Sequence, residues 1–597
     1  MNKFLKFAGL FPILVSAMLL FSMELNSQSR VGIIPQPLNI LNQGGGLLKL
    51  DGSTRILVTN PAGQNSASFL AEYLKRYYGI ELKVVNSTGV VGAAGGVKRG
   101  GAKLSADIVL GFTPNGAKRV ASEDFDPGNP AGGVDESGYR LKVSADGVLL
   151  EGEGRQGLFY AVQSLIQMLP VPEGLVGVSS VGKKASEVPV PSRGEGVVVK
   201  SLMLPFAEVE DKPRFEYRGM HLDVVRHIWS IDYIKQYIDY LALHKMNYFH
   251  IHLTDDQAYR MESRKYPKLN SIGSWRAGTI IGLFPGTGMD STRYGGFYTF
   301  EELKDIVKYA SERYITVVPE IDVPAHSMAI IASYPQFSTT PEIPKQPAIT
   351  WGIYNRQNNV LAPSDELFVF LKDIFNELMD VFPSKYVHIG ADECAKRWWE
   401  ESESTKEYMR VNGIPDFNML QRHFVEKLTD VMAERGRVVI GWDEMIDDGL
   451  VPGSVVMSWR NATNGHKAAR QGHKTILTPS RYSYFNIQQR ENEDSLAHRG
   501  RVVGLEQVYK FEPAPDSLSA AAKANILGGQ GCMWTEYYPH RQRLEYGIFP
   551  RLSAISEVYW SVPEVRNYEN FVERLQTQFR RYDLWGANYY SGDRRKW

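Results

Sequence analysis

The sequence of 597 residues has only two cysteines, Cys394 and Cys532, and no excess of charge of either sign. Two cysteines without metal-type spacing exclude a disulfide framework and a zinc site built on thiolates. The 67 basic residues equal the 67 acidic residues in number, so nothing indicates a nucleic-acid partner or an anionic membrane surface. Beyond the first thirty residues, no apolar run approaches the length that a membrane span requires.

The longest apolar run lies at the start of the chain. Lys3 and Lys6 give a positively charged start, an apolar run extends from Leu10 to Phe21, and small or polar residues follow at 27–29. This order is typical of a secretory signal peptide. We therefore expect residues 1–29 to be removed on export across the inner membrane, to the periplasm or the outside. The mature protein is then expected to contain no membrane span. The alternative is an uncleaved N-terminal anchor.

Two structural units are expected after this segment. Residues 30–205 combine a helical pattern at 66–78, a hairpin at 139–152 with an Asp-Gly turn, and a second helix at 157–169. This combination predicts a small α+β domain. From 206 to 597, eight strand patterns alternate with helical patterns, which predicts a closed (β/α)8 TIM barrel of the α/β class. The expected strands are 217–225, 248–253, 315–322, 386–391, 438–440, 455–457, 475–477 and 526–528.

Acidic residues and tryptophans follow the ends of these strands. In a barrel of parallel strands, functional residues lie at the carboxyl ends. Asp392 and Glu393 directly follow the fourth strand. Adjacent carboxylates cannot both ionise freely, so we expect one to stay charged and the other to hold a proton near neutral pH. Tryptophan faces stack on sugar C–H surfaces and carboxylates bind hydroxyls, so this mixture indicates a carbohydrate site. The tryptophans are Trp442, Trp459 and Trp534.

Two plainer interpretations apply to parts of this set. An Asp-Glu pair after a strand can simply cap the following helix. His250 and His252 present both rings on one face of a strand, as in some metal-dependent barrel hydrolases. The companions of a binuclear site are not evident in the sequence, so we expect neither a metal nor another cofactor.

Taken in order along the chain, the motifs at the strand ends resemble those of glycoside hydrolase family 20, the β-N-acetylhexosaminidases. The resemblance covers the whole expected barrel and extends into the small domain through the segment Gly157–Gln163. The matching segments are YRGMHLDVVRH at 217–227, HIHLTDDQ at 250–257, PEIDVPAHS at 319–327, HIGADE at 388–393, GWDE at 441–444, SW at 458–459 and GGQGCMWTE at 528–536.

The resemblance implies an exo-acting, retaining hydrolase that removes terminal β-linked N-acetylglucosamine or N-acetylgalactosamine. In this family the 2-acetamido oxygen of the substrate attacks the anomeric carbon. The expected partner is therefore an oligosaccharide or glycoconjugate that ends in N-acetylhexosamine. Asp392 is implied to orient the acetamido group and to stabilise the oxazolinium intermediate, and Glu393 to act as general acid and then base. The implied substrate-binding residues are Arg218 at the ring hydroxyls, Trp442, Trp459 and Trp534 around the acetamido group, Tyr484 at its carbonyl, Glu536 and Asn486 at the outer hydroxyls, and Asp255 and His326 beside Glu393.

The sequence departs from the family pattern in three places, one of which is Phe511, where some relatives have a tryptophan at the leaving-group side. Ala325 replaces a glycine, which adds only a methyl group, and Asn486 replaces an aspartate, so tolerance between gluco and galacto substrates can differ. A family member that releases disaccharides is an alternative, for which the loop 276–298 would have to leave a wider site. An inactive sugar-binding module is another alternative, but both carboxylates are present. The natural glycan and the oligomeric state stay open.

Overall fold

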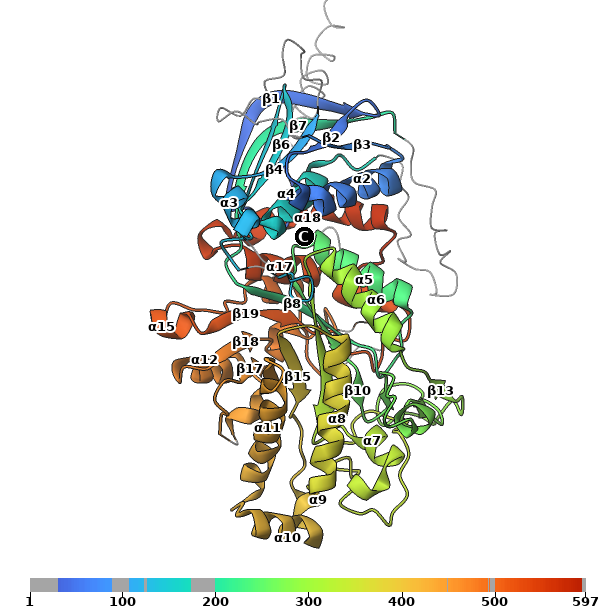
Figure 1. Ribbon diagram of the computed structural model, residues 1–597. Helices are drawn as coiled ribbons and strands as arrows, with labels where there is room; N and C mark the ends of the chain where they lie inside the picture. The colour runs from blue at the N-terminus through green and yellow to red at the C-terminus, as the bar shows by residue number, and fades with distance from the viewer. Residues whose placement is uncertain are drawn as a thin grey trace, which may run out of the picture.

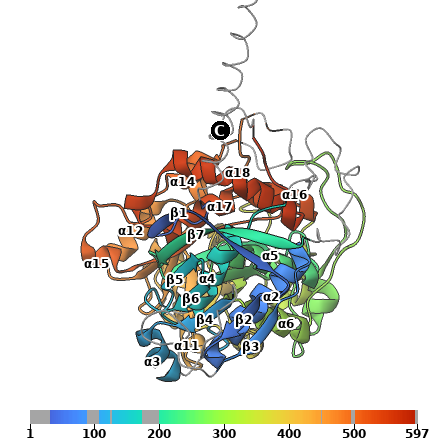
Figure 2. The same ribbon diagram turned by 90° about the horizontal axis from the view of Figure 1, so that it is seen from above.

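The computed structural model describes residues 31–592, except 88–106, 123–125, 132, 173–198, 448, 492 and 494–499. The predicted signal peptide at 1–29 lies outside the described residues. Within the described residues the chain forms a small domain and a barrel, with the small domain seated on one end of the barrel (Figures 1 and 2). No helix in this part of the chain has the length and apolarity that crossing a bilayer demands.

The small domain is built on one sheet with helices on the side that faces the barrel (Figure 1). The predicted Asp-Gly hairpin is present as the antiparallel pair β5 and β6. The long outer strands β1 and β7 escaped prediction. The sheet order is β1-β7-β5-β6-β4-β2-β3, with β1 Asn39–Asp51, β2 Arg55–Val58, β3 Lys83–Asn86, β4 Ile108–Phe112, β5 Tyr139–Ser144, β6 Gly147–Gly152 and β7 Ser201–Asp211; the helices are α2 Gln64–Tyr78, α3 Pro114–Ser122 and α4 Arg155–Met168.

The predicted domain boundary at 205/206 is wrong. It falls inside β7, which pairs with β1 and β5 as far as Asp211. Because a strand in the middle of a sheet cannot be divided between domains, the small domain extends to about residue 211. The first barrel strand, β8, begins at Tyr217.

The predicted barrel is confirmed. Eight parallel strands close in the order β14-β15-β16-β17-β18-β19-β8-β9. A capping box at Thr299 opens α6, with the Thr299 hydroxyl accepting a hydrogen bond from Glu302 N. The strands are β8 Tyr217–Asp223, β9 Tyr248–His252, β14 Thr316–Val323, β15 Tyr386–Gly390, β16 Val438–Trp442, β17 Val455–Ser458, β18 Lys474–Leu477 and β19 Ile526–Gly531; the main helices around them are α5 Ile231–Leu243, α6 Phe300–Ser311, α8 Asp365–Val381, α11 Phe417–Ala433, α12 Ala462–Arg470 and α17 Arg551–Trp560.

Two consecutive helices lie near the C-terminal end of the barrel. α16 Arg541–Ile548 ends before Pro550 and α17 starts after it, because proline lacks the N–H that a continuous helix needs. A further helix, α18 Tyr568–Trp585, follows. It lies between the small domain and the barrel (Figure 1), where Trp585 donates to the Tyr73 hydroxyl at 2.9 Å.

Buried polar contacts tie the small domain to the amino ends of the barrel strands. Arg218, the second residue of β8, donates to the hydroxyl of Tyr160 in α4 at 2.6 Å. Lys245, just before β9, lies 3.2 Å from Asp211 Oδ2, and both are fully buried. The opposite, carboxyl end of the barrel is therefore the end left for a site.

Candidate active site

The Asp392-Glu393 pair sits at the carboxyl end of β15 on an unusual backbone. Gly390, Ala391 and Glu393 all have positive φ, of 70°, 70° and 46°. Two of these are not glycine, so the turn stores backbone strain of the kind found at functional sites. Glycine is required at 390, because a Cβ there would lie 1.7 Å from Oδ1 of Asp322. The turn thus brings a third carboxyl group against the pair.

Asp322 and Asp392 form a buried pair of carboxyl groups. Their oxygens and a ring nitrogen of His326 all lie within 4.8 Å of one another. Burial, together with the charge of Asp392, holds the pKa of Asp322 well above its usual range, so Asp322 is a neutral proton donor. Burial also raises the pKa of Asp392 to about 6, against a lowering by His326 and by a hydrogen bond from Asp322. Asp322 was not among the site residues predicted from the sequence.

His326 connects both carboxylates to a second acidic group. Its Nδ1 lies 3.1 Å from Asp255 Oδ1 and 3.2 Å from Asp256 Oδ2. Its Nε2 lies 3.4 Å from Glu393 and 3.8 Å from Asp392. Burial opposes a positive ring, but these carboxylates hold the pKa of His326 well above its usual range. The predicted positions of Asp255 and His326 beside Glu393 agree with this geometry.

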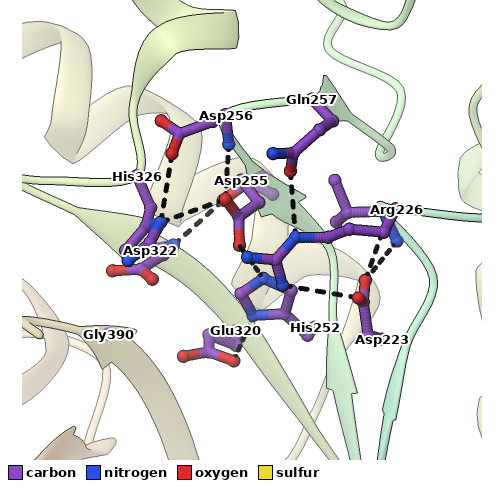
Figure 3. A network of polar contacts seen from close by, with 12 residues as sticks. Asp223, Arg226, His252, Asp255, Asp256, Gln257, Glu320, Asp322, His326 and Gly390 are labelled. Atoms are coloured by element: carbon purple, nitrogen blue, oxygen red, sulfur yellow. Dashed lines mark hydrogen bonds and ion pairs between the residues drawn. The ribbon is translucent and has the colours of Figure 1, made fainter. Parts of the chain in front are cut away.

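A line of alternating charges continues behind His326 (Figure 3). Arg226 Nη2 lies 2.6 Å from Asp255 Oδ2, and His252 Nε2 lies 2.9 Å from the same oxygen. His252 Nδ1 lies 2.5 Å from Glu320. Burial opposes charge on His252, yet the carboxylates on both sides raise its pKa to about 10. A fully buried imidazolium therefore fixes Asp255, which in turn orients His326.

Aromatic side chains from successive strand ends converge around the pair. Trp442 is 1% exposed and donates its indole N–H to Glu320 at 3.0 Å. Trp459 donates to Glu444 at 3.0 Å and stacks on Tyr484, with ring centroids 6.1 Å apart. Trp534 contacts both Trp442 and Tyr484. The structure thus brings together the four aromatic residues that were predicted to surround the acetamido group.

The remaining polar residues lie on the β8 and β19 side of the site. Arg226 lies 5.2 Å from the ring of Trp534. Burial opposes its charge, and the negative charges of Asp255, Asp223 and Glu536 raise its pKa. Asn486 is 4% exposed, and its side-chain oxygen has no hydrogen-bond partner among the described residues. Asn486 and Glu536 are thus placed where hydroxyl groups of a ligand could bind.

Other groups of acidic and histidine side chains approach the geometry of a metal site. The sets His221–His250–Glu320 and Asp255–Asp256–His326 each bring ligand atoms within 4.8 Å of one another. Glu320 already accepts from His252 and Trp442, and His326 is shared between two carboxylates. In both sets these contacts already engage the ligand atoms in ion pairs and hydrogen bonds.

Known proteins share both the fold and the motifs. Residues 215–563 match the family described as glycosyl hydrolase family 20, catalytic domain, and residues 30–183 match its domain 2. The chain belongs to glycoside hydrolase family 20. A beta-hexosaminidase of Porphyromonas gingivalis is 35% identical over 94% of this chain, and the chain spans 64% of that relative's length. One from Akkermansia muciniphila is 30% identical over 74% of this chain and 83% of its own.

A solved structure of the same family superposes closely. The exo beta-N-acetylglucosaminidase of Vibrio harveyi in complex with N-acetylglucosamine has a TM-score of 0.75 and 28% identity, covering 94% of this chain and 79% of that one. The likeness therefore extends over both the small domain and the barrel of this family 20 chain.

The structure contradicts one predicted contact, that of Arg218 with the sugar. Arg218 is 1% exposed and donates to Lys245 O, Phe215 O and the Tyr160 hydroxyl. It lies at the amino end of β8, whereas Arg226 follows the carboxyl end. The direction of the strand could have shown from the sequence that the two arginines lie at opposite ends of the barrel, because eight residues of extended chain span about 26 Å. Arg226 is the arginine of this family 20 site.

Substitutions of Arg218 and Arg226 are expected to have different effects, the first on stability and the second on activity. Arg218→Met is expected to lower the free energy of unfolding by about 3 kcal/mol, because it leaves buried oxygen acceptors without donors. Arg226→Lys is expected to lower kcat/KM by about 10- to 100-fold, because ammonium cannot reproduce the guanidinium contacts. Thermal unfolding and kcat/KM measured on both variants check this. A large loss of activity in a folded Arg218→Met protein would contradict the assignment.

Proposed function

We propose that this protein is an exo-acting, retaining β-N-acetylhexosaminidase that uses the acetamido group of its substrate as nucleophile. The observation that carries the proposal is the largely buried Asp392 beside the more exposed Glu393 at the carboxyl end of the barrel, where three tryptophans and Tyr484 also gather. Membership of family 20 and the relatives named beta-hexosaminidase support the same activity.

In the first step Glu393 donates a proton to the glycosidic oxygen while the acetamido oxygen attacks the anomeric carbon. The bond to the leaving group breaks and an oxazolinium ring forms. Asp392 accepts a hydrogen bond from the acetamido N–H and stabilises the positive charge that develops on the oxazolinium ring. Water then attacks the anomeric carbon, Glu393 removes a proton from it, and the oxazolinium ring opens. Two inversions at the same carbon give net retention.

The electrostatics of the site fit these two roles. Glu393 is partly exposed, with 37% of its side chain accessible, so it can reach both the leaving oxygen and water. His326 lies within 3.4 Å of Glu393 and places a positive charge beside it. Asp392 has a side chain only 13% exposed, which suits a residue that lies beneath the sugar and contacts the acetamido group.

The proposed exo action removes one N-acetylhexosamine at a time. Arg226 and Glu536 would bind the outer hydroxyls. Phe284, in the loop 276–298, donates its backbone N–H to the Tyr537 hydroxyl at 3.1 Å, next to Glu536. A loop fastened there would limit the room at the non-reducing end, which supports exo action over release of disaccharides. Asn486 adds no charge at the outer hydroxyls, so we propose that both gluco and galacto forms are accepted.

The pH dependence of kcat/KM follows from the Asp392 and Asp322 pair. Asp392 must be anionic to bind the acetamido N–H, and its pKa is raised to about 6, so activity is expected to fall as pH drops through about 6. Asp322→Ala removes a hydrogen bond that lowers this pKa, so the acid limb of the pH profile of kcat/KM is expected to move to higher pH. Asp322→Asn keeps an N–H donor, so its acid limb is expected to stay in place or to move to lower pH. Identical acid limbs in the wild type and both variants would contradict the pairing of Asp322 with Asp392.

The direct test of the function uses two aryl glycosides that differ only at carbon 2. Hydrolysis of an aryl β-N-acetylglucosaminide and almost no hydrolysis of the matching aryl β-glucoside would support substrate assistance. Equal rates would indicate an ordinary two-carboxylate glycosidase. Hydrolysis of neither would favour a disaccharide-releasing enzyme or a sugar-binding protein.

We propose that the protein acts after export across the inner membrane, in the periplasm or outside. The charged start and apolar run within residues 1–29 support this. N-terminal sequencing of the protein from its native host is expected to begin near residue 30. A retained Met1 would contradict removal of the segment.

A further inference from the structure

The turn that carries the Asp392-Glu393 pair is fixed at Ala391. This alanine has a φ of 70°, in the left-handed region that residues other than glycine rarely adopt. Its N–H donates to Val323 O of β14 at 3.2 Å, and its carbonyl accepts from Gln421 Nε2 of α11 at 2.9 Å. The carbonyl of Ala391 belongs to the same planar peptide unit as the N–H of Asp392. The contact with Gln421 therefore orients the backbone from which Asp392 starts.

Gln421 is held in the orientation that this contact requires. It is 2% exposed, and its side-chain oxygen accepts a hydrogen bond from Lys396 Nζ. Because an ammonium group can only donate, the amide oxygen faces Lys396 and the amide NH2 group faces Ala391. Lys396 lies three residues after Glu393. Gln421 therefore links the backbone just before the two carboxylates to the backbone just after them.

A second attachment to α11 does not involve Gln421. Trp399, in the short helix α9 Arg397–Glu400, is fully buried and stacks on Phe424 of α11, with ring centroids 5.8 Å apart. The indole N–H of Trp399 donates to Leu361 O at 2.8 Å. Phe424 follows Gln421 by three residues and so lies on the same side of α11. Because this packing holds the chain after the two carboxylates in place, loss of the Gln421 contacts is expected to disturb the turn without unfolding the protein.

We propose that Gln421 is a positioning residue for the Asp392-Glu393 pair. Lys396 in turn positions Gln421. The inference rests on the proposed function, because it concerns the two carboxylates that carry the reaction. Ala391 and Glu393 both have positive φ, so the turn would relax if the buried Ala391 carbonyl lost its donor. Rotation of that peptide would move Asp392 away from the acetamido group and Glu393 away from the glycosidic oxygen. Displacements of about 1 Å are enough to slow such reactions about 100-fold.

The test uses variants that remove the two contacts of Gln421 together or one at a time. Gln421→Met removes both, so kcat on an aryl β-N-acetylglucosaminide is expected to fall about 10- to 100-fold and KM to stay within about twofold, since the residues that bind the sugar come from other strands. Gln421→Glu keeps an acceptor for Lys396 but, when ionised, has no donor for Ala391 O, so a similar loss is expected. Lys396→Met leaves Gln421 able to donate, so kcat is expected to fall only about 3- to 10-fold.

Affinity for a thiazoline that mimics the oxazolinium ring separates positioning from a loss of stability. In Gln421→Met this affinity is expected to weaken in parallel with kcat, because Asp392 no longer lies against the ring. A protein that is merely less stable would bind fewer thiazoline molecules, each with wild-type affinity.

Gln156→Met is the matched control. Gln156 is also 2% exposed and also donates its Nε2 to a backbone carbonyl, that of Tyr314 at 3.1 Å, but it lies in α4 of the small domain. Since distant sites act independently, this variant is expected to keep kcat and thiazoline affinity within about twofold of the wild type.

Unchanged kcat and thiazoline affinity in Gln421→Met would overturn the inference, and so would equal losses in Gln421→Met and Gln156→Met. If Gln421→Met does not fold, Lys396→Met gives the same comparison with a partly exposed side chain, and unchanged values there would overturn the inference as well. Failure of the proposed function has a different signature, because the wild-type protein would then hydrolyse the aryl glycoside without any need for the acetamido group, or not at all. Parallel losses of kcat and thiazoline affinity in Gln421→Met, with Gln156→Met unaffected, support the positioning role.

Discussion

Glu393→Gln is expected to lower kcat/KM on chitobiose by about 1,000- to 10,000-fold, because the amide has the shape of the acid but no proton to donate. The effect depends on the leaving group. The 2,4-dinitrophenolate leaving group departs without protonation, so kcat/KM for a 2,4-dinitrophenyl glycoside should fall far less. Its kcat should still fall, because Glu393 also activates water in the second step.

The second role of Glu393 gives this prediction an independent readout. Azide needs no general base, so adding it should restore turnover of the dinitrophenyl substrate by Glu393→Gln and give a β-glycosyl azide. Azide should have no comparable effect on the wild-type protein. Equal losses on chitobiose and the dinitrophenyl glycoside, with no azide rescue, would contradict the acid-base assignment.

Asp392→Ala is expected to lower kcat/KM by about 100- to 1,000-fold on every leaving group, because it removes the charge that stabilises the oxazolinium ring. Asp392→Asn is expected to lose nearly as much, since the amide keeps the shape without the charge. Binding of a thiazoline that mimics this ring should weaken in parallel with the rate. A loss confined to poor leaving groups would contradict this role and assign proton transfer to Asp392.

The two variants together distinguish the roles of Glu393 and Asp392. Glu393→Gln should be sensitive to the leaving group, and Asp392→Ala should not. Both side chains are at least partly accessible and neither is a core residue, so both variants should fold. Thermal unfolding of each protein provides the control for structure.

Most of the barrel was predictable because its signals are local. Several strands are short runs rich in β-branched residues, such as Thr316–Val323 and Val438–Trp442, and helices with clear N-caps lie between strands, as at Thr299 and Ser364. The elements that escaped prediction depend on distant parts of the chain. β1 and β7 pair across more than 140 residues, and α18 is held by contacts with the small domain. The local sequences of β1, β7 and α18 therefore do not indicate which distant segments they contact.

The same limit applies within the site. The Asp392-Glu393 pair and the tryptophans could be found, because they directly follow recognisable strands. Arg218 and Arg226 occur in one motif, and only their positions at opposite ends of β8 distinguish a domain contact from a site contact. From the sequence, the adjacency of the two carboxylates alone was expected to keep one of them charged. In the structure, burial raises the pKa of Asp392 most, His326 lowers it and the charge of Glu393 raises it, while Asp322 from the neighbouring strand β14 adds a hydrogen bond that lowers it.

The central claim is that the substrate supplies its own nucleophile, and progressive fluorination of the N-acetyl group tests it most directly. Each fluorine makes the amide oxygen a weaker nucleophile without changing the leaving group. The account predicts that kcat/KM falls steeply and continuously from the acetyl to the trifluoroacetyl aryl glycoside. Rates that stay level across the series, or a covalent glycosyl adduct on Asp392 or Glu393, would contradict it.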